Sequence, residues 1–411
     1  MNHKKKLIPF LLSLIGLFLA NTLLNAASAN PIIPIGANSS QPTFTPAAPN
    51  INAKGYILID ADSGKVIVEK NADLHLPPAS LTKLMSLYII SSALKSGAIH
   101  MDDKVRISSK AWKAEGSRMF IKVNDEVSVQ DLLQGVVVDS GNDATIALAE
   151  YIASAEDAFT SMMNTQAKQL GMNNSHFTDS TGLPDPEHYS TPRDFALLTQ
   201  AYIKSFPEDY HFFAQKWFAY NGIRQPNRNR LLWRLPEADG LKTGHTKDAG
   251  YCLIGSAKKN NMRLISVVMG SPSDVVRTEE SIRLLNYGFR FYETHKIYGA
   301  NETISSAHVW KGANKEVRLG LAEDLYLTVA NNQVKNIQKN VVLLNSLKAP
   351  IEKGQTLGTL NVTINNQILA SQAIIALESN PRGSLWRSMA DSMGYAFQKI
   401  FSKSHETINN D

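Results

Sequence analysis

The sequence has few residues suited to cross-linking or metal binding. It contains a single cysteine, Cys252, so no intramolecular disulfide can form. Cys252 lies in an apolar segment, where we expect a buried, inert thiol rather than a second nucleophile. The ten histidines show no His-Glu-x-x-His pattern or similar ligand spacing, so the sequence predicts no metal and no other cofactor.

A strong charge imbalance is also lacking. The formal net charge of the whole chain is +5, but residues 1–29 carry three lysines and no acidic residue, so the remainder carries only +2. Nucleic-acid binding needs a basic surface. The sequence therefore gives no reason to expect a nucleic acid as a partner.

A long apolar run occurs near the start of the chain, at residues 7–19, and it is short for a membrane span. Three lysines at 4–6 precede it, and Ala-Ser-Ala at 27–29 follows. This order predicts a secretory signal peptide, residues 1–29, cleaved after Ala29. An uncleaved membrane anchor is the alternative. We therefore expect an exported, periplasmic protein.

Composition and hydrophobic pattern divide residues 30–380 into three segments. Residues 30–50 are rich in Pro, Asn, Ser and Thr, which predicts an extended linker. In residues 51–293, a predicted hairpin at 55–69 and strands after 240 flank a helical region from 80 to about 205, which indicates an α+β domain. Short alternating runs separated by turn residues predict a small all-β domain at 294–380.

The last segment, residues 383–403, has the pattern of an amphipathic helix. Aromatic and methionine side chains on one face, with basic residues nearby, suit a helix lying in a membrane interface. Packing against the protein itself is the alternative. We expect attachment to a membrane surface, and the family resemblance given below implies the outer face of the inner membrane. The apolar positions are Leu385, Trp386, Met389, Met393, Phe397, Ile400 and Phe401.

Three short motifs stand in a fixed order: Ser-Leu-Thr-Lys at 80–83, Ser-Gly-Asn at 140–142 and Lys-Thr-Gly at 242–244. Each motif alone is weak evidence. The ordered set is strong, because together the motifs supply every part of an acyl-transfer site that uses lysine as its base.

The first motif places a nucleophile beside a base. Residues three apart on a helix share one face, so the hydroxyl of Ser80 and the amine of Lys83 can come within hydrogen-bond reach. Serine needs an adjacent base, and lysine serves as one only when burial or a second cation lowers its pKa. Lys242 is the expected second cation. Prolines at 77 and 78 predict that the helix begins at Ser80, and Gly97 closes it. A simple N-cap serine with a solvated lysine is the alternative.

The other two motifs have structural alternatives as well. Ser-Gly-Asn at 140–142 joins two apolar segments and is expected in a tight turn, where such residues also serve as ordinary helix caps. Lys-Thr-Gly precedes a predicted hairpin of two strands joined at 258–261. We expect it on a strand of an antiparallel sheet, where Gly244 leaves room for another backbone. A polar edge strand is the alternative.

The chain resembles the serine penicillin-binding proteins and β-lactamases. It is most similar to the type-5 group of low-molecular-mass penicillin-binding proteins, the D-alanyl-D-alanine carboxypeptidases, from about residue 45 to about residue 400. Gly141 stands where β-lactamases have Asp, and Ser-Gly-Asn is the form typical of the carboxypeptidases. The segments that carry the resemblance are 79–85, 140–144, 228–233 and 239–246.

The resemblance implies a fold and a chemistry. The fold would be a transpeptidase-like catalytic domain, with an antiparallel sheet and a helical region, followed by the β-rich domain. Ser80 would be the acylated nucleophile and Lys83 its general base. Ser140 would pass a proton to the leaving D-alanine amine, and Asn142 would contact the substrate or Lys83.

The strand motif would bind the substrate's terminal carboxylate. The resemblance implies that Lys242, Thr243 and Thr246, with Arg228, hold that carboxylate, because charge-assisted hydrogen bonds are the strong ones. Gly244 would let a substrate strand lie close. The backbone N–H groups of Ser80 and His245 would form an oxyanion hole.

The expected activity is removal of the terminal D-alanine from peptidoglycan pentapeptides ending in D-Ala-D-Ala, with β-lactam antibiotics as covalent inhibitors. Alternatives are a peptidoglycan DD-endopeptidase and a weakly active wall-binding or scaffolding relative. A β-lactamase is the third enzymatic choice. The sequence has no Glu-x-x-Leu-Asn element to position a deacylating water, so efficient β-lactam hydrolysis is not expected.

Overall fold

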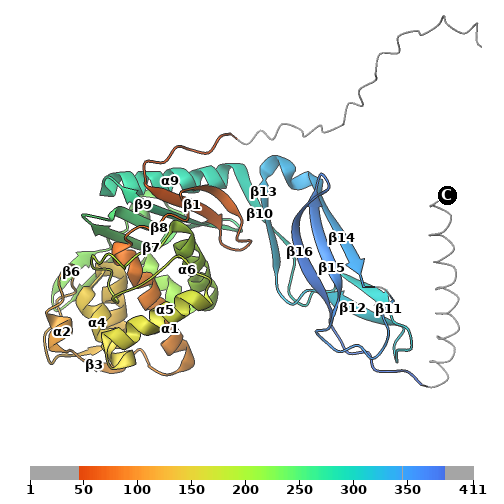
Figure 1. The fold of residues 1–411 in the computed structure, drawn as a ribbon, viewed down its shortest axis with the longest axis horizontal. Helices are drawn as coiled ribbons and strands as arrows, with labels where there is room; N and C mark the ends of the chain where they lie inside the picture. Colours follow the sequence, from red (N-terminus) through yellow and green to blue (C-terminus); the bar gives the residue numbers. More distant parts are fainter. Residues whose placement is uncertain (1–45, 345, 385–411) are drawn as a thin grey trace, which may run out of the picture. The chain divides into compact units, whose positions relative to one another are not determined.

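The computed structural model describes residues 46–344 and 346–384. Its first sheet has the strand order β2-β1-β9-β8-β7, and every neighbouring pair is antiparallel (Figure 1). The first strands of the chain thus lie in one sheet with strands formed some 180 residues later, as predicted. The strands are β1 (Gly55–Asp60), β2 (Val66–Lys70), β7 (Ala238–Thr246), β8 (Gly250–Lys259) and β9 (Met262–Ser271).

Both faces of this sheet are covered, which explains why β1 is buried at all six positions. Neighbouring residues of a strand point to opposite faces. Accordingly, Leu58 packs with Leu284 of helix α9 (Asp274–Phe291), whereas Ile57 packs with Leu84 and the helical region. Figure 1 shows α9 along one face of the sheet and the helices of residues 83–96 and 192–205 on the opposite side.

The helical region separates β2 from β7 in the sequence, as predicted. It also holds two small two-stranded antiparallel sheets, β3–β4 and β5–β6, that the sequence did not predict. Its elements are η1 (Ala79–Thr82), α1 (Lys83–Ser96), β3 (Lys104–Arg106), α2 (Ser109–Trp112), β4 (Glu126–Ser128), α3 (Val129–Gln134), the π-helical turn η2 (Gly135–Asp139), α4 (Asn142–Ala153), α5 (Glu156–Gln169), α6 (Pro192–Ser205), α7 (Pro207–Tyr210), η3 (His211–Ala214), β5 (Trp217–Tyr220), β6 (Ile223–Pro226) and α8 (Leu231–Arg234).

The helix of the first motif begins with a tighter turn than predicted. Residues 79–82 form the 3₁₀ turn η1, and α1 continues it from Lys83. Ser80 and Lys83 still lie one turn apart. Gly97 closes α1 in the left-handed conformation (φ 73°), as its position in the sequence predicts.

The segment after α9 is all-β, as predicted, and has its own apolar core, which includes Val317, Leu319 and Leu360. Strand β10 pairs with β13, and a second sheet has the order β11-β12-β16-β15-β14. The elements are β10 (Tyr292–Tyr298), β11 (Ser305–His308), β12 (Glu316–Gly320), β13 (Leu325–Ala330), η4 (Asn331–Asn336), β14 (Ile337–Leu343), β15 (Thr356–Ile364) and β16 (Gln367–Ala376).

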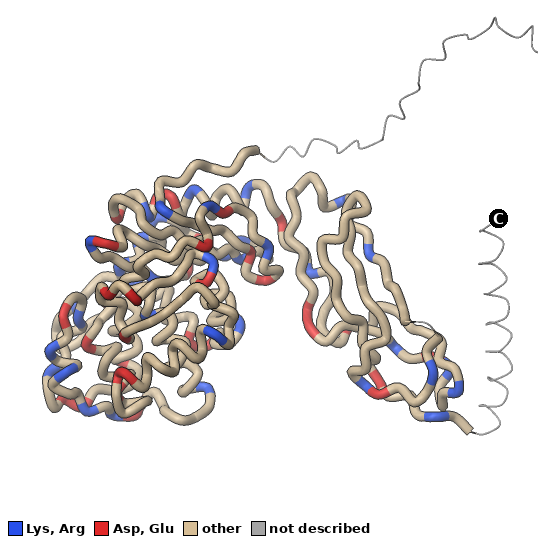
Figure 2. Tube along the Cα trace, in the orientation of Figure 1, with Lys and Arg blue, Asp and Glu red and all other residues tan. Residues whose placement is uncertain are grey.

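Acidic and basic residues alternate along the described trace without a long block of one sign (Figure 2). No helix within residues 46–344 and 346–384 is both long and apolar enough to cross a bilayer. The predicted signal peptide, linker residues 30–45 and all but the first two residues of the predicted helix at 383–403 lie outside the described residues. These segments and the domain boundaries stay predictions.

Candidate active site

The three motifs meet in one cleft of about 530 Å³. Six residues singled out from the sequence line it: Ser80, Ser140, Arg228, Thr243, Gly244 and His245. The side chains of Lys83, Lys242 and Asn142 are buried directly behind this surface. Residues from η1, the turn before α4 and strand β7 are therefore brought together across more than 160 positions of sequence.

Lys83 is fully buried and bonds the nucleophile candidate. Its Nζ donates to Ser80 Oγ at 2.9 Å and to the carbonyl oxygen of Thr181 at 2.8 Å. The pKa of Lys83 is lowered to about 7, mainly by burial and also by the charge of Arg228, whereas the charges of Asp179 and Asp143 act in the opposite direction. A lysine in this state is half neutral near pH 7 and can accept a proton.

Arg228 contributes to lowering the pKa of Lys83, which the sequence did not indicate. The predicted second cation, Lys242, interacts with Lys83 as well, because each buried amine disfavours protonation of the other. Lys242 is itself buried, and burial holds its pKa well below the ordinary value, with contributions from the charges of Lys83, Arg228 and Arg277. Two buried amines so close to one another are not both readily protonated. Arg228 reaches the site because its Nε donates to the carbonyl oxygen of Asp139 at 3.1 Å.

Ser140 sits in a conformation that few residues adopt. It follows the π-helical turn η2 and has φ 57° and ψ 34°, in the left-handed region. This geometry, together with the start of α4 two residues later, turns its hydroxyl toward β7. Lys242 Nζ donates to Ser140 Oγ at 2.8 Å and to the carbonyl oxygen of Thr243 at 3.1 Å. The predicted tight turn is present.

Asn142 begins α4, and its contacts are to backbone rather than to Lys83. Its N–H donates to the carbonyl oxygen of Ser117 at 2.7 Å, and its side-chain amide donates to that of Glu115. Among the described residues its Oδ1 is buried without a hydrogen-bond partner. Asn142 thus ties the turn to the 115–117 segment and retains one unsatisfied acceptor.

The Lys-Thr-Gly motif lies on strand β7, as predicted. A Cβ at Gly244 would stand 2.9 Å from the carbonyl oxygen of Pro78 and 3.1 Å from the backbone nitrogen of Ser80. The backbone that approaches Gly244 is therefore that of η1. The Ser80 backbone nitrogen thus lies beside Gly244, the residue that precedes His245 on β7.

The last two residues of β7 differ in position. His245 lines the cleft, stacks on Tyr251 at 3.9 Å between ring centroids, and its Nδ1 lies 3.0 Å from the carbonyl oxygen of Gly250. Thr246 does not line the cleft, and its hydroxyl accepts the N–H of Ala249 at 3.1 Å.

Sequence reasoning missed Arg277 on α9. Its Nη1 donates to the carbonyl oxygens of Gly244 on β7 (2.9 Å) and Cys252 on β8 (3.1 Å), so it links these two strands. Asp274 pairs with Arg277 and also with Arg230 at 2.6 Å. An arginine three residues after an aspartate is common in helices, so no local signal distinguishes it. The other cleft residues not predicted are Ser117, Gln225, Pro226, Asn227 and Tyr251.

No group of three or more His, Cys, Asp or Glu side chains in the described ranges is arranged to hold a metal ion. Cys252 is fully buried on β8, and burial raises the pKa of its thiol to about 11. A thiol in this state is protonated at neutral pH and unreactive.

Comparison with known families and proteins agrees with this geometry. The family described as D-alanyl-D-alanine carboxypeptidase matches residues 42–273, and the C-terminal domain of penicillin-binding protein 5 matches residues 292–382. The chain is 42% identical to D-alanyl-D-alanine carboxypeptidase DacC of Escherichia coli (strain K12), over 87% of this chain and 91% of that protein. It is 40% identical to DacA of the same strain over the same shares.

Solved structures give the same result. Penicillin-binding protein 5 from Haemophilus influenzae superposes with a TM-score of 0.79 at 40% identity, covering 82% of this chain and all of that one. Penicillin-binding protein D2 from Listeria monocytogenes, in its ampicillin-bound form, matches with a TM-score of 0.55 at 29% identity, over 59% of this chain and 100% of that one. This chain belongs to the D-alanyl-D-alanine carboxypeptidase family.

Proposed function

We propose that this protein is a serine-type D-Ala-D-Ala carboxypeptidase that removes the terminal D-alanine from peptidoglycan pentapeptides. The observation that carries this proposal is the 2.9 Å contact between Ser80 Oγ and the buried Lys83 amine, whose pKa is lowered to about 7. Neutral Lys83 takes the proton of Ser80 as its Oγ attacks the carbonyl carbon of the penultimate D-alanine.

The first half of the reaction breaks the peptide bond. A Ser80 ester forms, the carbon–nitrogen bond breaks, and the leaving D-alanine amine takes a proton. The proton that Lys83 took from Ser80 passes to this amine through the hydroxyl of Ser140, which Lys242 holds at 2.8 Å, so Lys83 is neutral again. The N–H groups of Ser80 and His245 stabilise the oxyanion. Lys83 then takes a proton from the attacking water and returns it to Ser80 Oγ as the ester is hydrolysed.

The cleft has the chemistry expected for a free carboxylate. Arg228, Thr243 and His245 line it, and Lys242 lies directly behind it. Cationic and hydroxyl groups bind a terminal carboxylate through charge-assisted hydrogen bonds, which an internal peptide bond cannot form. This preference favours a carboxypeptidase over a DD-endopeptidase or a weakly active wall-binding relative. Asn142 fixes the orientation of the turn that carries Ser140. Gly244 has no side chain and so lets the backbone at Ser80 lie close to β7.

Two measurements test the activity. We expect free D-alanine to be released from a pentapeptide much faster than cross-linked muropeptides are cleaved. We also expect mass spectrometry after penicillin treatment to show one covalent adduct, absent in Ser80→Ala and present in Ser96→Ala, an exposed serine at the end of the same helix. An unmodified wild-type protein that releases no D-alanine would overturn the proposal.

We further propose that the enzyme acts in the periplasm, on the outer face of the inner membrane. The support is sequence pattern alone: the lysine-flanked apolar run with Ala-Ser-Ala at 27–29, and the amphipathic segment at 383–403. Fractionation of cells that carry the full chain or a chain ending at residue 382 tests this. The full chain should sediment with membranes, and the shortened chain should be soluble in the periplasm.

A further inference from the structure

The Lys83 amine has a second oxygen partner, the carbonyl of Thr181, at 2.8 Å. Thr181 belongs to the irregular segment between α5 and α6, yet it is buried. A hydrogen bond that orients a catalytic amine is useful only if its acceptor is itself held in place. The contacts of residues 178–190 show what holds it.

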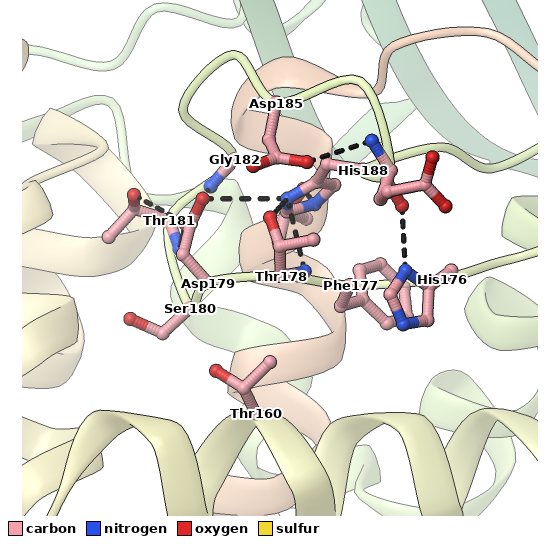
Figure 3. Close-up of polar contacts among 12 residues, drawn as sticks. Thr160, His176, Phe177, Thr178, Asp179, Ser180, Thr181, Gly182, Asp185 and His188 are labelled. Carbon is pink, nitrogen blue, oxygen red and sulfur yellow. Dashed lines mark hydrogen bonds and ion pairs between the residues drawn. The ribbon is translucent and has the colours of Figure 1, made fainter.

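Asp179 organises the turn that contains Thr181. One carboxylate oxygen accepts hydrogen bonds from the Thr181 N–H, the Thr181 hydroxyl (2.8 Å) and the Gly182 N–H (2.7 Å). The other oxygen lies 3.4 Å from Nδ1 of His188. Figure 3 shows the Asp179 carboxylate between this backbone turn and the His188 ring.

His188 connects the turn to the catalytic motif. Its side chain is 1% exposed, and its Nε2 lies 2.9 Å from the hydroxyl of Thr82, the residue between Ser80 and Lys83 in the 3₁₀ turn. Its Nδ1 also lies 3.0 Å from the hydroxyl of Thr178. The ring therefore spans from Asp179 to η1, and the mechanism above does not use it.

The same turn packs against η1 and α1 at two further points. Ser86 Oγ donates to the carbonyl oxygen of Ser180 at 2.6 Å. A Cβ at Gly182, which has φ 91°, would stand 1.9 Å from the carbonyl oxygen of Ala79, so only glycine fits. The turn and the base thus form one packed unit.

We propose that Asp179 and His188 are positioning residues, which together hold the Thr181 carbonyl oxygen against the amine of Lys83. This proposal rests on the assignment of Lys83 as the base. Because neither side chain contacts the cleft, their effect on catalysis passes through Thr181 and Thr82.

The pair also acts through charge. Burial alone would raise the pKa of Asp179, but the hydrogen bond and charge of His188, with the N–H groups of Gly182 and Thr181, hold it well below its ordinary value. Asp179 is therefore an anion at every working pH. Its charge raises the pKa of Lys83, as does that of Asp143 on α4, whereas Arg228 lowers it.

Lys242 on β7 also interacts with Lys83, because the charge of Lys83 lowers the pKa of Lys242. Removing the charge of Asp179 while retaining its shape should therefore make Lys83 neutral at a lower pH. A role limited to packing would leave the titration of Lys83 unchanged.

The experiment compares Asp179→Asn, Asp179→Ala and His188→Ala with wild type. The matched control is Asp185→Asn, an exposed aspartate of the same segment that bonds the Glu187 N–H and is not among the charges acting on Lys83. Two readouts are taken on the purified protein across pH 5 to 9: penicillin acylation rate, and the titration of Lys83 followed by NMR of ¹³Cε-labelled lysine, assigned with Lys83→Arg.

We expect Asp179→Asn to shift both profiles toward acid by at least about half a pH unit, while its plateau acylation rate stays within about threefold of wild type. Asp179→Ala and His188→Ala should lower the plateau rate about tenfold or more, because the Thr181 carbonyl is no longer fixed. Asp185→Asn should match wild type. If Asp179→Ala does not fold, Asp179→Asn still decides the question.

If the wild type is acylated but the pH profiles of Asp179→Asn and Asp185→Asn coincide, the positioning role of Asp179 is wrong. A wild type that is never acylated, while Asp179→Asn still shifts the NMR titration of Lys83, would instead overturn the proposed function and support the link between Asp179 and Lys83.

Discussion

Lys83 shows how burial changes the chemistry of a side chain. In water its amine is a cation with a pKa near 10.4 and no capacity to accept a proton at neutral pH. In this structure it is 0% exposed, and its pKa falls to about 7. Sequence spacing placed it beside Ser80, but only the surrounding packing makes it a base.

Acylation by a chromogenic β-lactam should therefore depend on pH. Below pH 7 Lys83 is protonated and cannot take the serine proton, so the rate should rise through about pH 7 and then level off. Lys83→Arg keeps a permanent charge and should lose at least about a hundredfold in rate. Stopped-flow rates from pH 5 to 9 measure both effects, and a flat wild-type profile would contradict the assignment.

Gly244 is a second position where a single atom matters. In Gly244→Ala the new Cβ would lie 2.9 Å from the Pro78 carbonyl oxygen and push β7 away from η1. We expect acylation to slow by about ten- to a hundredfold, because the oxyanion donors separate. Gly299→Ala is the control, since its nearest atoms are at 3.3 Å or more. Equal rates in the two variants would refute the close-approach argument.

At the scale of elements, the junction between η2 and α4 decides where Ser140 points. The π-helical turn ends in the left-handed Ser140, and α4 begins two residues later. Asp143 in the first turn of α4 is 0% exposed and accepts the N–H groups of Met119, Phe120 and Ala144 at 2.9 to 3.0 Å. Its carboxylate joins the helix to the segment that also binds Asn142.

Asp143→Ala should consequently lower the free energy of unfolding by about 2–4 kcal/mol, because it leaves buried N–H groups without an acceptor. Denaturant titration measures the loss. Asp157→Ala, an exposed aspartate in the first turn of α5, should change stability by about 0.5 kcal/mol. Similar losses in both variants would show that the Asp143 network contributes little.

At the scale of the whole molecule, the described residues form separate apolar cores. Two of them cover the faces of the sheet that carries β7, and a third fills the all-β part. The described residues that line the cleft all lie between positions 80 and 277. No described residue of the all-β part is among them.

Truncating a core side chain in the all-β part should lower the free energy of unfolding without changing the acylation rate. Leu360→Ala removes a fully buried side chain from β15 and should cost about 2–5 kcal/mol. The acylation rate of the protein that remains folded should equal that of wild type. Leu264→Ala, in the core between the sheet and α9, should instead impair both. Slower acylation in Leu360→Ala would reveal coupling between the two parts.

Much of the fold was predictable because its signals are local. The hairpin at 55–69, the helix closed by Gly97 and the strand carrying Lys242 all follow from periodicity and turn residues within short windows. The short strands β3 to β6 were missed because three or four residues carry too little periodic signal. Arg277 was missed because its partners, the carbonyls of Gly244 and Cys252, come from strands 25 to 33 residues away.

The amino-acid order by itself determined which reactive groups are present and that Ser80 and Lys83 lie one turn apart, because helical geometry relates residues three positions apart. Tertiary structure alone decided that Arg228 contributes to lowering the pKa of Lys83, and that Asp179 and His188 support the base. Those relations depend on distances between segments remote in sequence, and such distances arise only when the chain packs.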